Sequence, residues 1–232
     1  MAPLPLLLSS PYLNLPHALI DSLLAPRRSL PPAALDDAAV APTLLSSAPS
    51  ASGFYNAGGV KGLIPQVYSA LEAQLLRAAA ERQAPLRLLH YLRDGWTYHA
   101  KGLWLWPPRT PTDACGAVGD GEKLGGPHTP SRLLPPPRAT HPVLTLIGST
   151  NLSERSSQRD IELSACLVTT DAAVRAQLHE EQARLTAHAV EVQTQTLPAG
   201  SPPADAPPSA AHAAARVSLL ARGLAVLLRS FF

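Results

Sequence analysis

Two strand-like segments, separated by a long proline-rich stretch, constrain the fold of this chain more than any other feature. The first covers residues 97–106, and the second runs from residue 143 to residue 168. Side chains of an extended strand point alternately to opposite faces, so His99 and Lys101 are expected to share one face. The second segment contains the turn-forming sequence Gly-Ser-Thr-Asn at 148–151. An imidazole and an ammonium beside such a turn form a candidate pocket.

The residue types in these segments suit a phosphate group. A lysine and two arginines bring positive charge, while a hydroxyl, an amide and the N–H groups of the turn are neutral donors. The candidate phosphate-binding residues are Lys101, Gly148, Ser149, Asn151, Arg155 and Arg159. A histidine held there can attack phosphorus and form a covalent intermediate, which divides one difficult displacement into two easier ones. His99 is therefore the candidate nucleophile.

Composition limits the class of protein. A chain of 232 residues with 46% hydrophobic content can bury a core, and one domain is the expectation. The formal net charge of +2, with no basic stripe interleaved with aromatics, argues against a nucleic-acid partner. The two cysteines, Cys115 and Cys166, make no disulfide framework or metal-ligand spacing, so neither a disulfide nor a metal site is predicted. The sequence contains no run of 18 or more apolar residues, so no transmembrane helix is predicted.

Hydrophobic periodicity predicts an α/β fold. Helices are predicted from about residue 15 to Pro26, over 65–82, and over 172–189 behind a Thr170-Asp171 cap. Strands are predicted at 43–45, 86–91, 97–106, 143–147 and 161–168. The apolar start, residues 1–8, lacks the basic residues of a signal peptide and is assigned no element.

Several segments have the composition of loops and linkers. Residues 107–142 are rich in proline and glycine without hydrophobic period, which predicts a disordered stretch. The glycine-rich loop 52–62 precedes a helix, where Lys61 and backbone N–H groups could hold an anion; a plain linker is the alternative. Residues 193–212 are read as a linker after a lobe spanning 1–192. Residues 213–232 mix leucine and arginine, which fits an amphipathic helix that packs on the domain or lies on anionic lipid.

The order of these pieces resembles the phospholipase D superfamily. The sequence TYHAKGLWLW at 97–106 is similar to the second His-x-Lys motif of that superfamily. It is followed by LTLIGSTN at 144–151, RS at 155–156 and RDIE at 159–162. In detail, these residues look most like the phosphatidylglycerophosphate synthase branch of eukaryotic type, the CDP-diacylglycerol–glycerol-3-phosphate 3-phosphatidyltransferases.

The resemblance implies a fold, an activity and a setting. The fold would be one phospholipase D-like lobe, a mixed β-sheet flanked by helices, with 107–142 as an insertion. The activity would be phosphatidyl transfer from CDP-diacylglycerol to glycerol 3-phosphate through a phosphohistidine, releasing CMP. No metal or other cofactor is implied. The partners would be the two substrates and a membrane surface, and the location the mitochondrial inner membrane, peripherally.

The resemblance also implies roles for individual residues. His99, Lys101, Asn151 and Glu162 would form the catalytic set. Many superfamily members carry an aspartate five residues after the motif lysine, where this chain has Trp106. Asp160 or Glu162 is therefore expected to replace it as the carboxylate that orients His99, because a catalytic imidazole needs one tautomer fixed.

Superfamily enzymes use two His-x-Lys motifs, and this chain has one. Of its eight histidines, His99 alone has a lysine two residues later. We therefore expect a fragment that lacks the first motif, and a monomer that needs a second lobe from a missing N-terminal half or from a second copy. A homodimeric single-motif phosphodiesterase or nuclease, and a non-catalytic lobe that binds lipid, are the alternatives.

Overall fold

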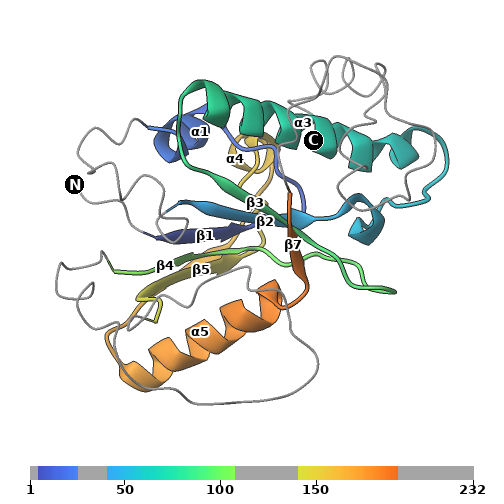
Figure 1. Ribbon diagram of the computed structural model, residues 1–232. Coiled ribbons are helices and arrows are strands. Elements are labelled where there is room, and N and C mark those ends of the chain that lie inside the picture. The colour runs from blue at the N-terminus through green and yellow to red at the C-terminus, as the bar shows by residue number, and fades with distance from the viewer. Residues whose placement is uncertain (1–4, 26–40, 108–140, 193–232) are drawn as a thin grey trace, which may run out of the picture.

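A seven-stranded mixed sheet forms the centre of the computed structural model, which describes residues 5–25, 41–107 and 141–192 (Figure 1). The strand order is β6-β5-β4-β1-β2-β3-β7. The strands are β1 Leu6–Ser9, β2 Thr43–Ser47, β3 Arg87–Tyr91, β4 Gly102–Leu105, β5 Leu144–Gly148, β6 Ser164–Val168 and β7 Ala189–Glu191.

The middle of the sheet is parallel and its flanks are antiparallel. Strand β2 pairs in parallel with both β1 and β3, whereas β4 runs antiparallel to β1, β5 to β4, β6 to β5, and β7 to β3. Parallel strands are normally covered on both faces, and their sequences are then apolar throughout. Consecutive leucines in β1, β2 and β3 meet this condition, since all six are at most 2% exposed: Leu7, Leu8, Leu44, Leu45, Leu88 and Leu89.

Helices cover the sheet on both faces (Figure 1). Helix α1, His17–Leu23, and helix α3, Ile64–Glu81, lie on one face, and α5, Ala172–Thr186, lies on the other. The short helices are η1 Pro49–Ala51, η2 Gly59–Leu63 and α4 Glu154–Gln158. Among the described helices, none has the length and apolarity needed to cross a membrane.

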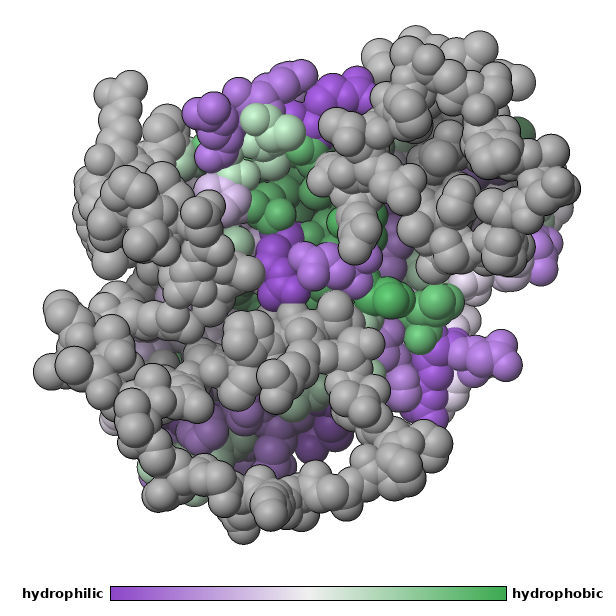
Figure 2. Space-filling model, in the orientation of Figure 1, coloured by the Kyte–Doolittle hydropathy of each residue, from purple (hydrophilic) through white to green (hydrophobic). Residues whose placement is uncertain are grey.

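The helices predicted over 65–82 and 172–189 are confirmed, and the second ends three residues earlier, at Thr186. In α3, Val67, Leu71 and Leu75 are buried, while Gln74 and Arg77 are exposed. This spacing is the 3.6-residue period of a helix with one apolar face. Figure 2 shows hydrophilic residues along the top of the molecule, with hydrophobic residues below them. In α5, the side chain of Asp171 accepts a hydrogen bond from the N–H of Val174, as a helix N-cap does.

The predicted strands are confirmed with shifted bounds, and two strands were not predicted. Strand β1 is one of them, although it lies in the middle of the sheet. Its four residues, Leu6–Ser9, follow a proline and are too few to show a period, so the apolar start gave no strand signal. Strand β7 has only three residues at the edge beside β3.

The segment that carries His99 differs from its prediction. Strand β4 begins at Gly102, so His99 and Lys101 lie in the extended stretch just before it. Two hydrogen bonds hold that stretch, and neither belongs to the regular pairing of β-strands. The Tyr98 N–H donates to the Ala51 carbonyl at 2.9 Å, and the Ser9 hydroxyl donates to the Ala100 carbonyl at 3.1 Å. Tyr98 is buried and His99 is exposed, whereas Ala100 and Lys101 are both of intermediate burial.

Two predicted segments fall mainly outside the described residues. They are 107–142, of which only 107, 141 and 142 are described, and 193–232 with the linker and the tail helix. The predicted domain limits therefore stay predictions.

Strand β6 is the edge strand beyond β5. All five of its residues are exposed, and Ile161 and Leu163 just before it are 102% and 83% exposed. The prediction of a strand from 161 to 168 was therefore three residues too long at its start, and Glu162 precedes the strand instead of entering it.

A buried ion pair joins α3 to the sheet. Glu72 of α3 and His90 of β3 meet at 2.8 Å, with side chains 5% and 14% exposed. Burial by itself would lower the pKa of His90, but the charge and hydrogen bond of Glu72 outweigh it, so that the pKa of His90 is raised. The pair thus fixes α3 over the ends of β2 and β3.

Replacing Glu72 by Gln is expected to destabilise the fold by about 3 kcal/mol near pH 6, since it leaves a buried imidazolium unpaired. A raised folded-state pKa means that the folded chain binds the proton more tightly. The stabilisation is therefore complete below the ordinary value of 6.5 and is lost as pH rises through the raised value. Urea unfolding between pH 5.5 and 9 measures the difference. Glu81→Gln, at an exposed position of the same helix, is the control, and a pH-independent difference would contradict the assignment.

Candidate active site

The candidate site lies at the end of the sheet where the parallel strands finish. Ser9 at the end of β1 is opposite Gly102 at the start of β4, and Leu103 is opposite Leu146 of β5. Residues 99–101 and 148–151 therefore come to the same edge as the carboxyl ends of β1, β2 and β3. Ligands of open α/β sheets bind at this edge.

His99 and Lys101 are in direct contact. The Lys101 Nζ lies 3.2 Å from His99 Nδ1 and 3.3 Å from Nε2, and it also donates to the His99 carbonyl at 3.3 Å. Burial, and then the charge of Lys101, lower the pKa of His99. A lowered pKa keeps the imidazole neutral at pH 7, which is the state that can act as a nucleophile.

Glu162 joins this pair from the second segment. Burial lowers the pKa of Lys101, and the nearby carboxylate of Glu162 partly opposes that effect. Glu162 Oε2 also accepts a hydrogen bond from the hydroxyl of Ser149. The two sequence segments thus meet, with His99, Lys101, Ser149 and Glu162 in one cluster.

Gly148 and Ser149 are fastened to the residues before β6. The Ser149 N–H donates to the Leu163 carbonyl at 3.0 Å, and the Leu163 N–H donates to the Ser149 hydroxyl at 3.1 Å. A Cβ on Gly148 would lie 2.7 Å from the Cα of Ser164. Glycine is therefore required here by the close approach of two backbones, which places the Ser149 hydroxyl beside Glu162.

Asn151 is anchored through its backbone. Its carbonyl accepts a hydrogen bond from the Ser10 hydroxyl at 2.8 Å. Its side-chain Oδ1 is buried and has no hydrogen-bond partner among the described residues, so it is a polar atom that a ligand could satisfy. No hydrogen bond within the described ranges joins the Asn151 side chain to His99 or Lys101, and its place at the same phosphate stays a prediction.

The other candidate residues lie around this cluster. Arg155 is in α4, which is capped by Ser153, and its Nε donates to Asp160 Oδ1 at 3.1 Å. Arg159 is the C-cap residue of the same helix. Lys61 is in η2, just before α3, where it is exposed and makes no hydrogen bond or ion pair with a described residue. The predicted ligand contacts of these residues remain untested.

No hydrogen bond joins Asp160 or Glu162 to the ring of His99 in the described part of the chain. Their hydrogen bonds go to Arg155 and Ser149. Trp106, at the position of the missing aspartate, is 7% exposed and packs with Trp104 in the core on the α5 side. The orienting role of a carboxylate therefore stays a prediction.

An aromatic cluster beside His99 was missed by the sequence analysis. The ring centroid of Tyr12 lies 6.0 Å from that of His99, and Tyr12 also packs on Tyr68 at 5.1 Å and on Phe54 at 5.9 Å. Burial, with a smaller contribution from Tyr12, raises the pKa of Tyr68, and the charge of Arg155 opposes this. These aromatics come from three separate segments, so no local pattern could have grouped them.

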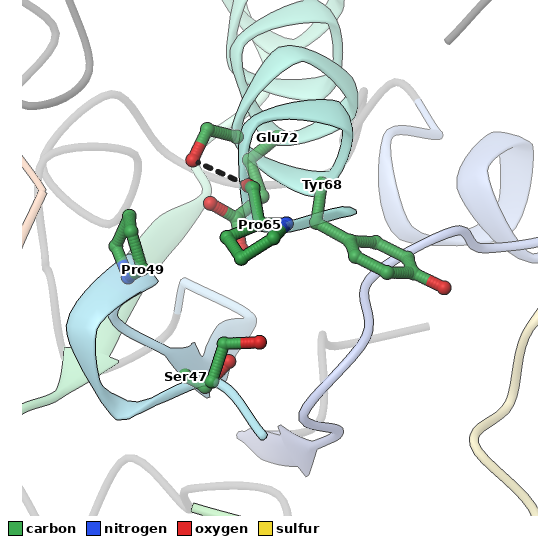
Figure 3. Close-up of a pocket in the computed structure, with 7 residues that line it drawn as sticks. Ser47, Pro49, Pro65, Tyr68 and Glu72 are labelled. Atoms are coloured by element: carbon green, nitrogen blue, oxygen red, sulfur yellow. Dashed lines mark hydrogen bonds between the residues drawn. The ribbon is translucent and has the colours of Figure 1, made fainter. Parts of the chain in front are cut away.

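A small pocket lies between the end of β2, η1 and the first turns of α3 (Figure 3). Ser47, Pro49, Pro65, Tyr68 and Glu72 are among its lining residues. Its cavity volume of ≈ 10 Å³ is about the space that one water molecule needs. It is too small for a nucleotide or a lipid headgroup.

Comparison with known proteins identifies relatives. Over 180 residues the chain is 33% identical to the mitochondrial CDP-diacylglycerol–glycerol-3-phosphate 3-phosphatidyltransferases of Gallus gallus and Homo sapiens. The predicted resemblance to this family is confirmed. Each alignment covers 77% of this chain and 25% of the relative, so the chain spans about a quarter of the length of these enzymes. A probable enzyme of the same name from Dictyostelium discoideum is 25% identical over 177 residues, which are 75% of this chain and 23% of that protein.

The fold has a solved counterpart. The crystal structure of phosphatidylserine synthase from Haemophilus influenzae superposes with a TM-score of 0.54 at 16% identity, over 81% of this chain and 33% of that one. At this identity the likeness concerns the fold, and it confirms the mixed α/β class. No family model matches the chain.

Replacing Lys101 by Met is expected to raise the pKa of His99 toward its ordinary value of 6.5, because one of the two causes of its lowering is removed. The titration of the His99 ring protons by NMR measures this. Lys61→Met removes the same charge from an exposed position and should leave the midpoint where it was. An unchanged midpoint in Lys101→Met would show that the lysine charge does not act on His99.

Replacing Gly148 by Ala is expected to cost about 1–3 kcal/mol of stability, because the new methyl group meets the backbone at Ser164. Gly58→Ala is the matched control, since a Cβ there meets nothing within 4 Å and its φ is −71°. Thermal unfolding compares the two variants. Equal stability of both would rule out close backbone approach as the reason for glycine at 148.

Proposed function

We propose that this chain is one lobe of a phosphatidyltransferase that forms phosphatidylglycerophosphate and CMP from CDP-diacylglycerol and glycerol 3-phosphate. The observation that supports it most directly is the contact between His99 and Lys101 beside Ser149 and Glu162. The names of the relatives, which are about 33% identical, point to the same two substrates.

In the first step, a neutral nitrogen of His99 attacks the phosphorus that carries the diacylglycerol. A P–N bond forms while the P–O bond to CMP breaks, and CMP leaves with the electron pair. The Lys101 ammonium stabilises the negative charge that develops on the phosphoryl oxygens. In the second step, a hydroxyl oxygen of glycerol 3-phosphate attacks the phosphorus of the phosphohistidine and gives its proton to a base. A P–O bond forms while the P–N bond breaks, and the electron pair returns to the imidazole nitrogen of His99.

The chain contains one His-x-Lys sequence, and the two steps need an acid for CMP and a base for the acceptor. We assign these proton transfers to a histidine of a second lobe, supplied by another part of a longer protein or by a second copy. The predicted Asn151 donor, the anion-binding role of Arg155, Arg159 and Lys61, and an orienting carboxylate belong to the same proposal.

The substrate sets where such a lobe works. CDP-diacylglycerol is held in a bilayer, so the lobe acts at a membrane surface. The relatives of Gallus gallus and Homo sapiens are named as mitochondrial, and we place this chain peripherally at the mitochondrial inner membrane. In this arrangement residues 1–192 form the lobe, and residues 193–212 link it to the amphipathic segment 213–232, which rests on anionic lipid.

A second function, that of a homodimeric phosphodiesterase, is favoured by the single His-x-Lys sequence of the chain. Two copies of such a chain would bring two motifs together in one symmetric site. Such an enzyme cleaves phosphodiesters with water and needs neither CDP-diacylglycerol nor glycerol 3-phosphate.

Replacing His99 by Ala tests both functions. CMP release from CDP-diacylglycerol in mixed micelles with glycerol 3-phosphate is measured together with the mass in solution. We expect release only from species of twice the 24.4 kDa chain mass, or after a second motif-bearing lobe is added. His99→Ala should lower the rate by roughly 10³-fold or more, and exposed His17→Ala should not.

Three results would contradict the proposal. Robust turnover by a proven monomer would exclude the need for two motifs. Cleavage of simple phosphodiesters without transfer to glycerol 3-phosphate would favour the homodimeric phosphodiesterase. Lipid binding that survives His99→Ala, with no CMP release under any condition, would leave a non-catalytic lobe.

A further inference from the structure

The ring of His99 has an aromatic neighbour from a distant part of the chain. Tyr12 lies in the loop between β1 and α1, and its ring meets that of His99 at an interplanar angle of 72°. Edge-to-face contact is a preferred arrangement of aromatic rings. Tyr12 is half-buried, and burial raises the pKa of its phenol, so its ring is held within the protein.

Lys101 alone does not select a tautomer of the imidazole. Its Nζ is 3.2 Å from one ring nitrogen and 3.3 Å from the other, so this contact does not distinguish which nitrogen is left free for attack. The carboxylates of Asp160 and Glu162 accept hydrogen bonds from Arg155 and Ser149. The Tyr12 ring reaches the imidazole from a separate segment, and its edge-to-face packing opposes rotation of the His99 side chain.

Tyr12 is itself firmly placed. Its ring packs on Tyr68 of α3 at an interplanar angle of 30°, and on Phe54. Its N–H donates to the Ser10 hydroxyl at 3.3 Å, and that hydroxyl donates to the Asn151 carbonyl. Tyr12 therefore connects helix α3, the loop of Asn151 and the imidazole of His99.

We propose that Tyr12 is a positioning residue for His99, whose aromatic ring holds the imidazole in the orientation needed for attack on phosphorus. This role rests on the proposed phosphatidyl transfer, in which a displaced nucleophile cannot line up with the leaving group. It requires the ring of Tyr12 and not its hydroxyl. Phenylalanine at position 12 should therefore preserve the orientation of the His99 imidazole, and leucine should not.

NMR of the full chain with ¹³C-labelled histidine tests the proposal without any substrate. In wild type, the His99 ring signals should carry ring-current shifts, show restricted motion, and titrate below the ordinary midpoint. Tyr12→Phe should keep all three properties. Tyr12→Leu should lose the shifts, increase the fast motion, and move the midpoint upward as burial is relieved, while Lys101 and Glu162 stay in place. Tyr55→Leu, at an exposed tyrosine, is the control.

Two outcomes would overturn the proposal. His99 signals and motion in Tyr12→Leu that match wild type would show that the ring contact does not position the imidazole. If Tyr12→Phe lost the ring-current shifts and the restricted motion of His99 as fully as Tyr12→Leu, the hydroxyl of Tyr12, and not its ring, would be the group that matters. If Tyr12→Leu does not fold, Phe54→Leu loosens Tyr12 from behind and should give a smaller change in the same direction; no change would again overturn it.

A kinetic arm uses whichever assembly releases CMP. There, Tyr12→Leu should lower kcat about tenfold or more with KM within about twofold, and Tyr12→Phe should restore kcat. A higher KM with kcat unchanged would contradict a positioning role. Because the NMR result needs no turnover, failure of the phosphatidyl-transfer proposal and failure of the Tyr12 proposal remain distinguishable.

Discussion

Burial of both faces of the parallel strands is the constraint on which the rest of the structure depends. Six leucines in β1, β2 and β3 are almost fully removed from water, and each contributes about 1.5–3 kcal/mol before the entropy cost of ordering. Because neither face can be left open, helices must cover both, with α1 and α3 on one side and α5 on the other. The polar residues that follow each leucine pair, such as Ser9 and Ser46, are thereby brought to one edge of the sheet.

The chemistry at that edge follows from partial burial combined with unlike charges. Lys101 is half-buried, which weakens its hold on a proton, yet Glu162 keeps the ammonium form favourable. The same ammonium disfavours protonation of His99. A neutral imidazole and a charged amine can therefore coexist 3.2 Å apart, which is the combination that attack on a phosphate ester requires.

Elements long enough to show a hydrophobic period could be predicted from the sequence. Elements whose formation depends on contacts with residues far away in the sequence could not. Helices α3 and α5 have 18 and 15 residues, which is long enough for the apolar face of α3 and the Asp171 cap of α5 to be predicted from the sequence. Strand β1, with four residues, has no readable period, and its partners β2 and β4 are set by tertiary packing.

The candidate site divides in the same way. His99, Lys101, Ser149 and Glu162 were grouped because two short segments carry a recognisable order of residue types. The contact of Tyr12 with His99 joins residues 87 positions apart, 99 minus 12, and Tyr12 lies outside both segments. An aromatic residue in a loop has many packing uses, so its type alone does not indicate a neighbour.

The position of β1 has a consequence for how this fold can be divided. Strands β4, β5 and β6 lie on one side of it and β2, β3 and β7 on the other, and the order of the sheet makes β1 the hydrogen-bonded link between the two groups. A chain shortened by its first ten residues would lose four residues of sheet, yet the hydrogen bonding of the sheet would be divided into two three-stranded groups. Side-chain packing, such as that of Leu45 and Leu89 with Trp104, would then join them.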